Sequence, residues 1–118
     1  YKEEITTNTD CGLAFINDLK PITYKWKAKA DIPDTFPDYD KDATTRRTDK
    51  KFYGMIAQDV KAALDKHSIT DFGGWNEIEH GIQTVSQEMF VHPLIKAVQE
   101  LKAELDAAKA RIKTLEDA

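Results

Sequence analysis

The C-terminal part of the chain carries its clearest structural pattern, and the sequence of this part is VHPLIKAVQELKAELDAAKARIKTLEDA (residues 91–118). Apolar residues recur in it at alternating spacings of three and four, which is an unbroken heptad repeat. The segment has no aromatic residue and no glycine, so it is predicted to be one long exposed helix with a narrow apolar stripe. The a and d positions of the repeat are Val91, Leu94, Val98, Leu101, Leu105, Ala108, Ile112 and Leu115.

Charged residues beside this stripe favour parallel association with copies of the same helix. Glu104 at a g position lies five residues before Lys109 at e, and Arg111 and Glu116 are related in the same way. Both pairs can form ion pairs between neighbouring parallel helices. The alternative is that the helix packs on its own domain, but a surface helix usually has a wider apolar stripe. We therefore expect self-association. The β-branched residues at a, with Leu at d, lean towards dimers, and Leu105 at a and the small Ala108 at d blur that lean.

Residues 1–90 have a globular composition, because both Trp, all four Tyr and all five Phe lie there. A short helix is expected to begin at a cap on Thr9 or Asp10 and to end before Pro21. A second, amphipathic helix is expected over about Met55–Lys66. The apolar side of this second helix would consist of Ile56, Val60, Ala63 and Leu64.

Short strands complete the predicted globular part. Ile22, Tyr24 and Trp26 alternate with polar residues, which predicts a strand with one buried aromatic face. The Gly-Gly pair in residues 72–75 predicts a turn between two strand-like runs, and Ile82–Val85 is a further candidate strand. The predicted fold class is therefore α+β: a small globular domain over residues 1–90, followed by a coiled-coil helix over residues 91–118.

Residues 28–51 form a long stretch without periodicity, and it contains six acidic and six basic residues. A loop of this length in a small domain is either functional or disordered. We consider two interpretations, a solvated loop and a protruding arm that contacts a partner. In the second interpretation Phe36 and Tyr39 would supply the apolar contacts, and Pro33 and Pro37 would stiffen the arm.

Composition excludes several classes of function. The chain has 118 residues, of which 41% are apolar and 32% are charged, and its net charge is −4. Nucleic-acid-binding modules are usually basic, so we expect no nucleic-acid partner. No apolar run reaches the roughly 18 residues of a membrane span, so no membrane partner is expected either. Cys11 is the only cysteine and cannot form an internal disulfide, which fits a reducing compartment.

Residue types that often bind metals occur here without the required spacing. Asp38, Asp40 and Asp42 resemble the start of a calcium loop, but Ala43 stands where that loop needs glycine and Asp49 where it needs glutamate. The three histidines lack zinc-ligand spacing, and no Gly-rich phosphate loop is present. The sequence therefore predicts neither a metal nor a cofactor.

Four segments in order carry a resemblance to a known family: GLAFIN (residues 12–17), LKPITYKWK (19–27), YGMIAQDV (53–60) and PLIKAVQEL (93–101). Together they resemble the C-terminal intramolecular chaperone, or auto-processing, domain of bacteriophage tail fibres and tailspikes. Endosialidase tailspikes, phage neck appendages and the eukaryotic myelin regulatory factor carry relatives of this domain. Each segment alone is a weak signal, whereas the ordered set is specific and extends over nearly the whole chain.

The resemblance implies a role in the folding of a fibre. The family's domain forms a homotrimer, aligns the upstream fibre or spike stem of the same polypeptide, and then releases itself. It would act in the host cell cytoplasm during virion assembly and be absent from the mature virion. Registering three chains is slow because of loop-closure entropy, and a trimeric seed removes most of that cost.

The resemblance also implies self-cleavage by a serine–lysine dyad, at a site similar to Ser-Asp-x-Arg-x-Lys-x-x-Ile that is cut just before the serine. Residues 2–5, KEEI, match the end of that motif, so Lys2 would be the general base. The serine and the arginine would lie five and two residues before Lys2, outside this chain. We expect the chain to be the released product of a serine endopeptidase precursor, or a trimmed form of it. Lys2 is otherwise an ordinary terminal lysine.

Two other functions compete with the self-releasing chaperone. One is an oligomerisation module that stays on its parent protein without cleavage. The other is a receptor-binding tip, in which residues 28–51 would contact a host surface. A Ser-Asp-x-Arg run directly upstream would favour cleavage, and a receptor-binding tip would have to remain on the mature particle.

Overall fold

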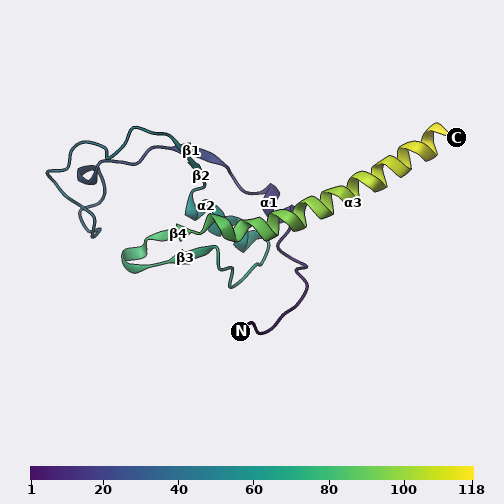
Figure 1. The fold of residues 1–118 in the computed structure, drawn as a ribbon, viewed down its shortest axis with the longest axis horizontal. Coiled ribbons are helices and arrows are strands. Elements are labelled where there is room, and N and C mark those ends of the chain that lie inside the picture. Colours follow the sequence, from purple (N-terminus) through teal and green to yellow (C-terminus); the bar gives the residue numbers. More distant parts are fainter.

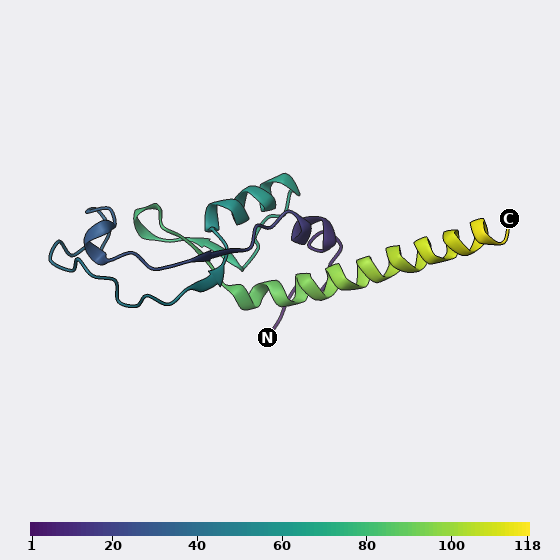
Figure 2. The same cartoon turned by 90° about the horizontal axis from the view of Figure 1, so that it is seen from above.

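The structure is a computed structural model that describes residues 1–118, and its layout is α+β, as the sequence predicts (Figure 1). It is elongated, with extents of 72 × 37 × 25 Å. A small globular body lies in the middle, the long C-terminal helix extends from one side, and residues 28–51 extend from the other (Figures 1 and 2). The helices are α1 (Leu13–Asn17), α2 (Ala57–Lys66) and α3 (Val91–Glu116), and the strands are β1 (Ile22–Tyr24), β2 (Phe52–Gly54), β3 (Trp75–Glu77) and β4 (Gln83–Val85).

The strands form two separate antiparallel pairs. β1 pairs with β2, with Ile22 opposite Gly54, and β3 pairs with β4, with Trp75 opposite Val85. Three short 3₁₀ segments complete the chain: η1 (Lys29–Asp31), η2 (Glu79–Gly81) and η3 (Gln87–Phe90). Because η3 leads directly into α3, the β3–β4 pair fixes where the long helix starts.

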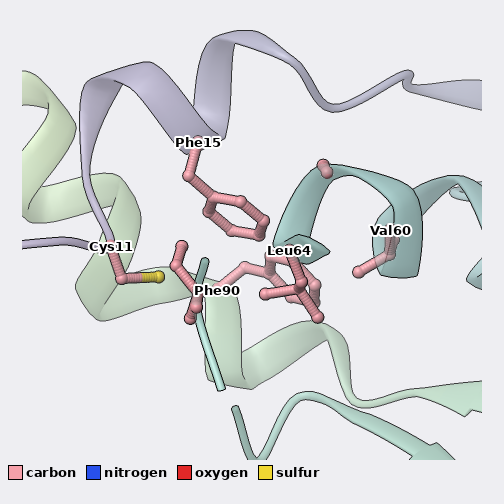
Figure 3. Close-up of a cluster of buried hydrophobic side chains, with 7 residues drawn as sticks. Cys11, Phe15, Val60, Leu64 and Phe90 are labelled. Atoms are coloured by element: carbon pink, nitrogen blue, oxygen red, sulfur yellow. The ribbon is translucent and has the colours of Figure 1, made fainter. Parts of the chain in front are cut away.

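The core is small, with 13 of 118 residues buried, and it lies where α1, α2 and the start of α3 meet (Figure 3). Phe15 of α1 is completely buried. Its ring stacks on Phe90 at 6.3 Å between centroids, and Phe72 meets Phe90 edge-on at 5.1 Å. Val60 and Leu64 of α2 complete the apolar contacts around these rings.

Both predicted helices of the globular part exist, but their N-terminal ends were predicted wrongly. The N-cap position of α1 is Gly12, which makes no side-chain capping bond, and not Thr9 or Asp10. Asn8 orders the turn before the helix, where its side-chain oxygen accepts the N–H of Cys11 at 3.0 Å. α2 begins at Ala57, after Ile56, and the Ile56 side chain is 45% exposed. The predicted buried positions Val60, Ala63 and Leu64 are confirmed.

The prediction that Gly73 and Gly74 connect two strands is wrong, since their turn connects the segment after α2 to β3. The turn of the β3–β4 hairpin lies instead between Ile78 and Ile82. The Ile78 N–H donates a hydrogen bond to the Ile82 carbonyl at 2.8 Å. His80 (φ 62°) and Gly81 (φ 72°) both adopt left-handed conformations in that turn. The turn thus needs only one glycine at its two left-handed positions, because histidine adopts left-handed backbone angles more readily than β-branched residues do.

The strand beginning at Ile22 is confirmed, but it ends at Tyr24, and Trp26 beyond it is 47% exposed. Its aromatic face is therefore only half-buried. Tyr24 stacks on Phe52 of β2 at 5.9 Å between centroids, and Trp26 meets Tyr24 edge-on at 5.3 Å. The strand β2 was not predicted, because three residues following a long charged loop show no usable period.

Candidate functional site

The first turns of α3 are attached to the globular body by one flank. Pro93 and Ala97 are buried there against the rest of the chain, and the Glu100 carboxylate accepts a hydrogen bond from the Leu13 N–H at 3.4 Å. The backbone approaches closely at Gly12, where an added Cβ would collide with the side chains of Glu100 and Lys96. The docked flank of α3 is thus formed by small or polar residues at positions c and g, beside the heptad stripe and not on it.

The heptad stripe itself, which we call the seam, is free. Its large apolar residues are between 48% and 67% exposed: Val91, Leu94, Val98, Leu101, Leu105, Ile112 and Leu115. Ala108 is exposed as well, and so is every residue from 101 to 118. The first turns of the helix thus pack on their own domain, as in the alternative considered above, but through their flank, and the seam stays exposed.

The charged residues predicted to pair between helices do not pair within the chain. The ion pair on this part of α3 joins Lys102 to Asp106 at 2.6 Å, one helical turn apart. Glu104, Lys109 and Arg111 therefore keep their charges available for another molecule.

An apolar groove of about 400 Å³ opens at the start of the seam, and the sequence did not predict it. It lies between α1, β2 and α3, and Tyr53 on its wall is 70% exposed. Seven of the ten lining residues are hydrophobic. The residues that line the groove are Ile16, Leu19, Pro21, Tyr53, Gly54, Met55, Gln87, Phe90, Val91 and Leu94.

Lys2 lies in the exposed N-terminal segment, which forms neither helix nor strand. The chain bends at Glu4, whose φ of 53° is left-handed, and then runs to the body near α1 (Figure 1). Lys2 makes no hydrogen bond and no ion pair within the chain. The structure of one chain thus leaves the predicted general base in solvent, with no nucleophile beside it.

Residues 28–51 form a protruding arm at the end of the molecule opposite the C-terminus of α3 (Figures 1 and 2). Backbone bonds give the arm some internal order: the Ala30 N–H donates to the Ala43 carbonyl at 3.0 Å, and the Tyr39 N–H donates to the Phe36 carbonyl at 3.0 Å. Phe36 is half-buried and Tyr39 is 37% exposed. Within this arm the Asp40 carboxylate accepts the N–H of Asp42, as in an ordinary polar turn.

Two titratable groups have shifted pKa values. Hydrogen bonds from His67 (2.5 Å) and Lys66 (3.0 Å) lower the pKa of the Asp18 carboxyl, and these contacts join the end of α1 to the end of α2. Burial, with a smaller contribution from the charge of Asp10, raises the pKa of the Cys11 thiol. The thiol therefore stays protonated and unreactive near neutral pH.

Comparison with known proteins identifies the family. A sequence model described as "Chaperone of endosialidase" matches residues 1–69, which is more than half of the chain. The chain belongs to this family. Its general role is therefore that of a chaperone. No curated protein and no solved structure matches it.

The family match includes α1, the β1–β2 pair, the arm and α2, whereas α3 lies outside it. The boundary predicted at residue 90 is not tested by this match and stays a prediction. None of the helices combines the length and the apolar character needed to cross a membrane.

Proposed function

We propose that this chaperone domain assembles as a parallel homotrimer through α3 and thereby aligns the upstream stem of its own polypeptide, a phage tail fibre or tailspike. The observation that carries the proposal is the free seam. Isolated helices shorter than about 12–15 residues are marginal in water, and most helical stability comes from packing an apolar face. The exposed part of α3 has such a face and nothing in its own chain to cover it.

Trimer formation would make the chain a folding seed. Three stems joined to one coiled coil begin in register, so each avoids a search for its partners before strands can pair. The chaperone would then act on its own polypeptide. We expect it to act in the host cell cytoplasm, during virion assembly.

Sedimentation equilibrium and light scattering of the chain test the assembly directly. A mass three times that of one chain at micromolar concentration is expected. A monomer would contradict self-association altogether. A dimer would contradict the proposed trimer but would still agree with parallel association of the helices.

We propose further that the domain is released from the folded fibre, and so is absent from the mature virion, by cleavage just upstream of this chain, with Lys2 as the general base. The neutral amine of Lys2 would accept the proton of an upstream serine hydroxyl as its oxygen attacks the carbonyl of the residue before the serine. The peptide bond to the serine nitrogen would then break as that nitrogen takes the proton back from Lys2, and water would hydrolyse the resulting ester, which frees the serine hydroxyl and leaves a carboxylate at the end of the stem. Since Lys2 is exposed in one chain, the surroundings that favour a neutral amine would have to come from the assembled precursor.

A precursor with Lys2→Ala tests this step. Trimer formation should persist while cleavage is abolished, and Lys113→Ala, at an exposed position of α3, is the matched control that should cleave normally. Denaturing gels of the precursor give the readout. Normal processing of Lys2→Ala would show that Lys2 is an ordinary terminal lysine.

The exposure of Lys2 also supports a second candidate function, an oligomerisation module that stays attached. In that case the wild-type precursor would trimerise and remain uncleaved, and the domain would be found on mature particles. A receptor-binding tip would also remain on particles, but it would additionally need the arm for attachment to the host.

A further inference from the structure

The apolar groove lies on one particular flank of α3. Phe90 on its wall is the residue immediately before Val91, so it occupies a g position of the heptad repeat. Val91 and Leu94, which also line the groove, are the first a and d residues of the seam. The groove is therefore continuous with the seam at its N-terminal end.

An unusual residue lies on the opposite flank. Ile95 occupies an e position, where the later heptads carry the charged residues Lys102, Lys109 and Glu116. Its side chain is 47% exposed, and the body of its own chain packs on the other side of the helix, against Ala97. With Val91 and Leu94, which are similarly exposed, Ile95 forms an apolar patch at this end of the seam, and such patches mark interaction sites.

The heptad register connects these two features. In parallel helices aligned in register, a g residue of one helix faces the e residue five positions later in the next helix. Glu104 with Lys109 obeys this relation, and Arg111 with Glu116 does as well. Phe90 with Ile95 is the same relation at the start of the seam, with an apolar pair in place of an ion pair.

We propose that Ile95 of a neighbouring copy of this chain inserts into the groove beside Phe90, so that each globular body contacts the next α3 around the trimer. The inference rests on the trimer proposed above and adds a contact outside the coiled coil. A second copy fits better than an unrelated partner because Val91 and Leu94 border the groove. Any other occupant would compete with the neighbouring helix for these two side chains.

With this contact, the globular body of each subunit would touch α3 of the next subunit around the ring of three. Tyr53 and Met55, in and just after β2, would become buried on assembly, so the position of the β1–β2 pair, and of the arm that it carries, would be fixed relative to the next subunit. The arms would then be held at defined angles around the stem.

Cross-linking tests the contact. The Tyr53→Cys/Ile95→Cys variant should give disulfide-linked trimers on non-reducing gels after mild oxidation. The matched control Tyr53→Cys/Gln99→Cys, with the second cysteine at an exposed b position, should give few, and wild-type chain with buried Cys11 should give none. Equal linking in the two double variants, in a protein that light scattering shows to be a trimer, would overturn the groove contact and leave the trimer intact.

A binding measurement complements the gel. Ile95→Gln keeps helix propensity and removes the apolar side chain, and it should raise the dissociation constant of the trimer about tenfold or more, because one contact is lost in each subunit. Gln99→Ala should leave it unchanged. A trimer unaffected by Ile95→Gln would contradict the contact, and a wild-type chain that is monomeric would contradict the trimer itself and this contact with it.

Discussion

The two ends of α3 share one sequence pattern and differ in everything around it. From Val91 to Glu100 the helix contacts the body through Pro93 and Ala97, whereas from Leu101 to Glu116 every residue is exposed. The seam nevertheless continues unchanged through both parts and is exposed in both. The body therefore holds α3 by its flank, and the apolar stripe stays free for other helices along its whole length.

The largest effect is expected from a charge placed in the free part of the seam. Leu101→Asp would bring one carboxylate per chain into a single buried layer, where burial and mutual repulsion both oppose assembly. We expect the trimer to dissociate into monomers at micromolar concentration, with the dissociation constant raised about a hundredfold or more. Analytical ultracentrifugation measures this change.

Ala103→Asp is the matched control, since residue 103 lies at an f position on the outer side of α3 and is also exposed. It introduces the same charge into the same turn and should leave the trimer intact. If both variants dissociated equally, helix stability and not the seam would be the cause.

The next largest effect concerns the docked part. Phe15→Ala removes the fully buried ring that stacks on Phe90 at the base of α3, and it should lower the free energy of unfolding by about 3–5 kcal/mol. Tyr39→Ala, in the exposed arm, should lower the free energy of unfolding by less than about 0.5 kcal/mol. Urea unfolding followed by Trp fluorescence compares the two. A small effect of Phe15→Ala would mean that the body does not depend on this core.

A smaller effect is expected for the chain alone when the arm is shortened. Deletion of residues 31–47 removes Phe36 and Tyr39 but no member of the core cluster, so the trimer and its melting temperature should change little. In the precursor, the same deletion should lower the yield of folded, cleaved fibre if the arm contacts a partner, as in the second interpretation above, and that partner is the stem. Wild-type yield from the shortened precursor would make the arm an ordinary solvated loop.

The smallest effect concerns the link between α1 and α2. The folded state lowers the pKa of the Asp18 carboxyl. The ionised carboxylate therefore stabilises the folded chain at pH values above the ordinary carboxyl pKa of about 3.9. This stabilisation is lost as the pH falls through the lower pKa of the folded state. Asp18→Asn should therefore melt slightly below wild type near neutral pH, and the difference should disappear under acid conditions. Thermal melts across this range provide the test, and a difference that is constant with pH would exclude the ionised carboxylate as its source.

Sequence reasoning was most successful where a periodic pattern was long. The heptad over α3 and the apolar face of α2 were recovered because each repeats over several turns, whereas β2 extends over only three residues. Local signals misled where an unseen partner intervened. The turn that Asn8 orders lies between Thr9 or Asp10 and the start of α1, so neither residue is the cap. The hairpin turn uses Gly81, although the Gly73–Gly74 pair is the stronger turn signal in the sequence.

The site could be predicted only as far as it lies in one segment. The seam is local in sequence, so its members were found, and their exposure could be checked residue by residue. The groove is not local: Leu19, Tyr53 and Phe90 come from three distant segments, and only the fold brings them together. Lys2 was predicted from resemblance and the arm residues from the character of their loop, and the roles of both depend on molecules beyond a single chain.

The small core has a consequence for the fate of the domain after its work. Only thirteen residues are buried, which is a small core for a chain of this length, so association in the proposed trimer would supply part of the stability. That part would depend on concentration by mass action. In the precursor, three attached stems would hold the subunits together at high effective concentration. Once released, the domains would dilute, separate and unfold locally more often, and proteases act on such opened chains. Release would thus start the removal of the chaperone with no dedicated degradation signal.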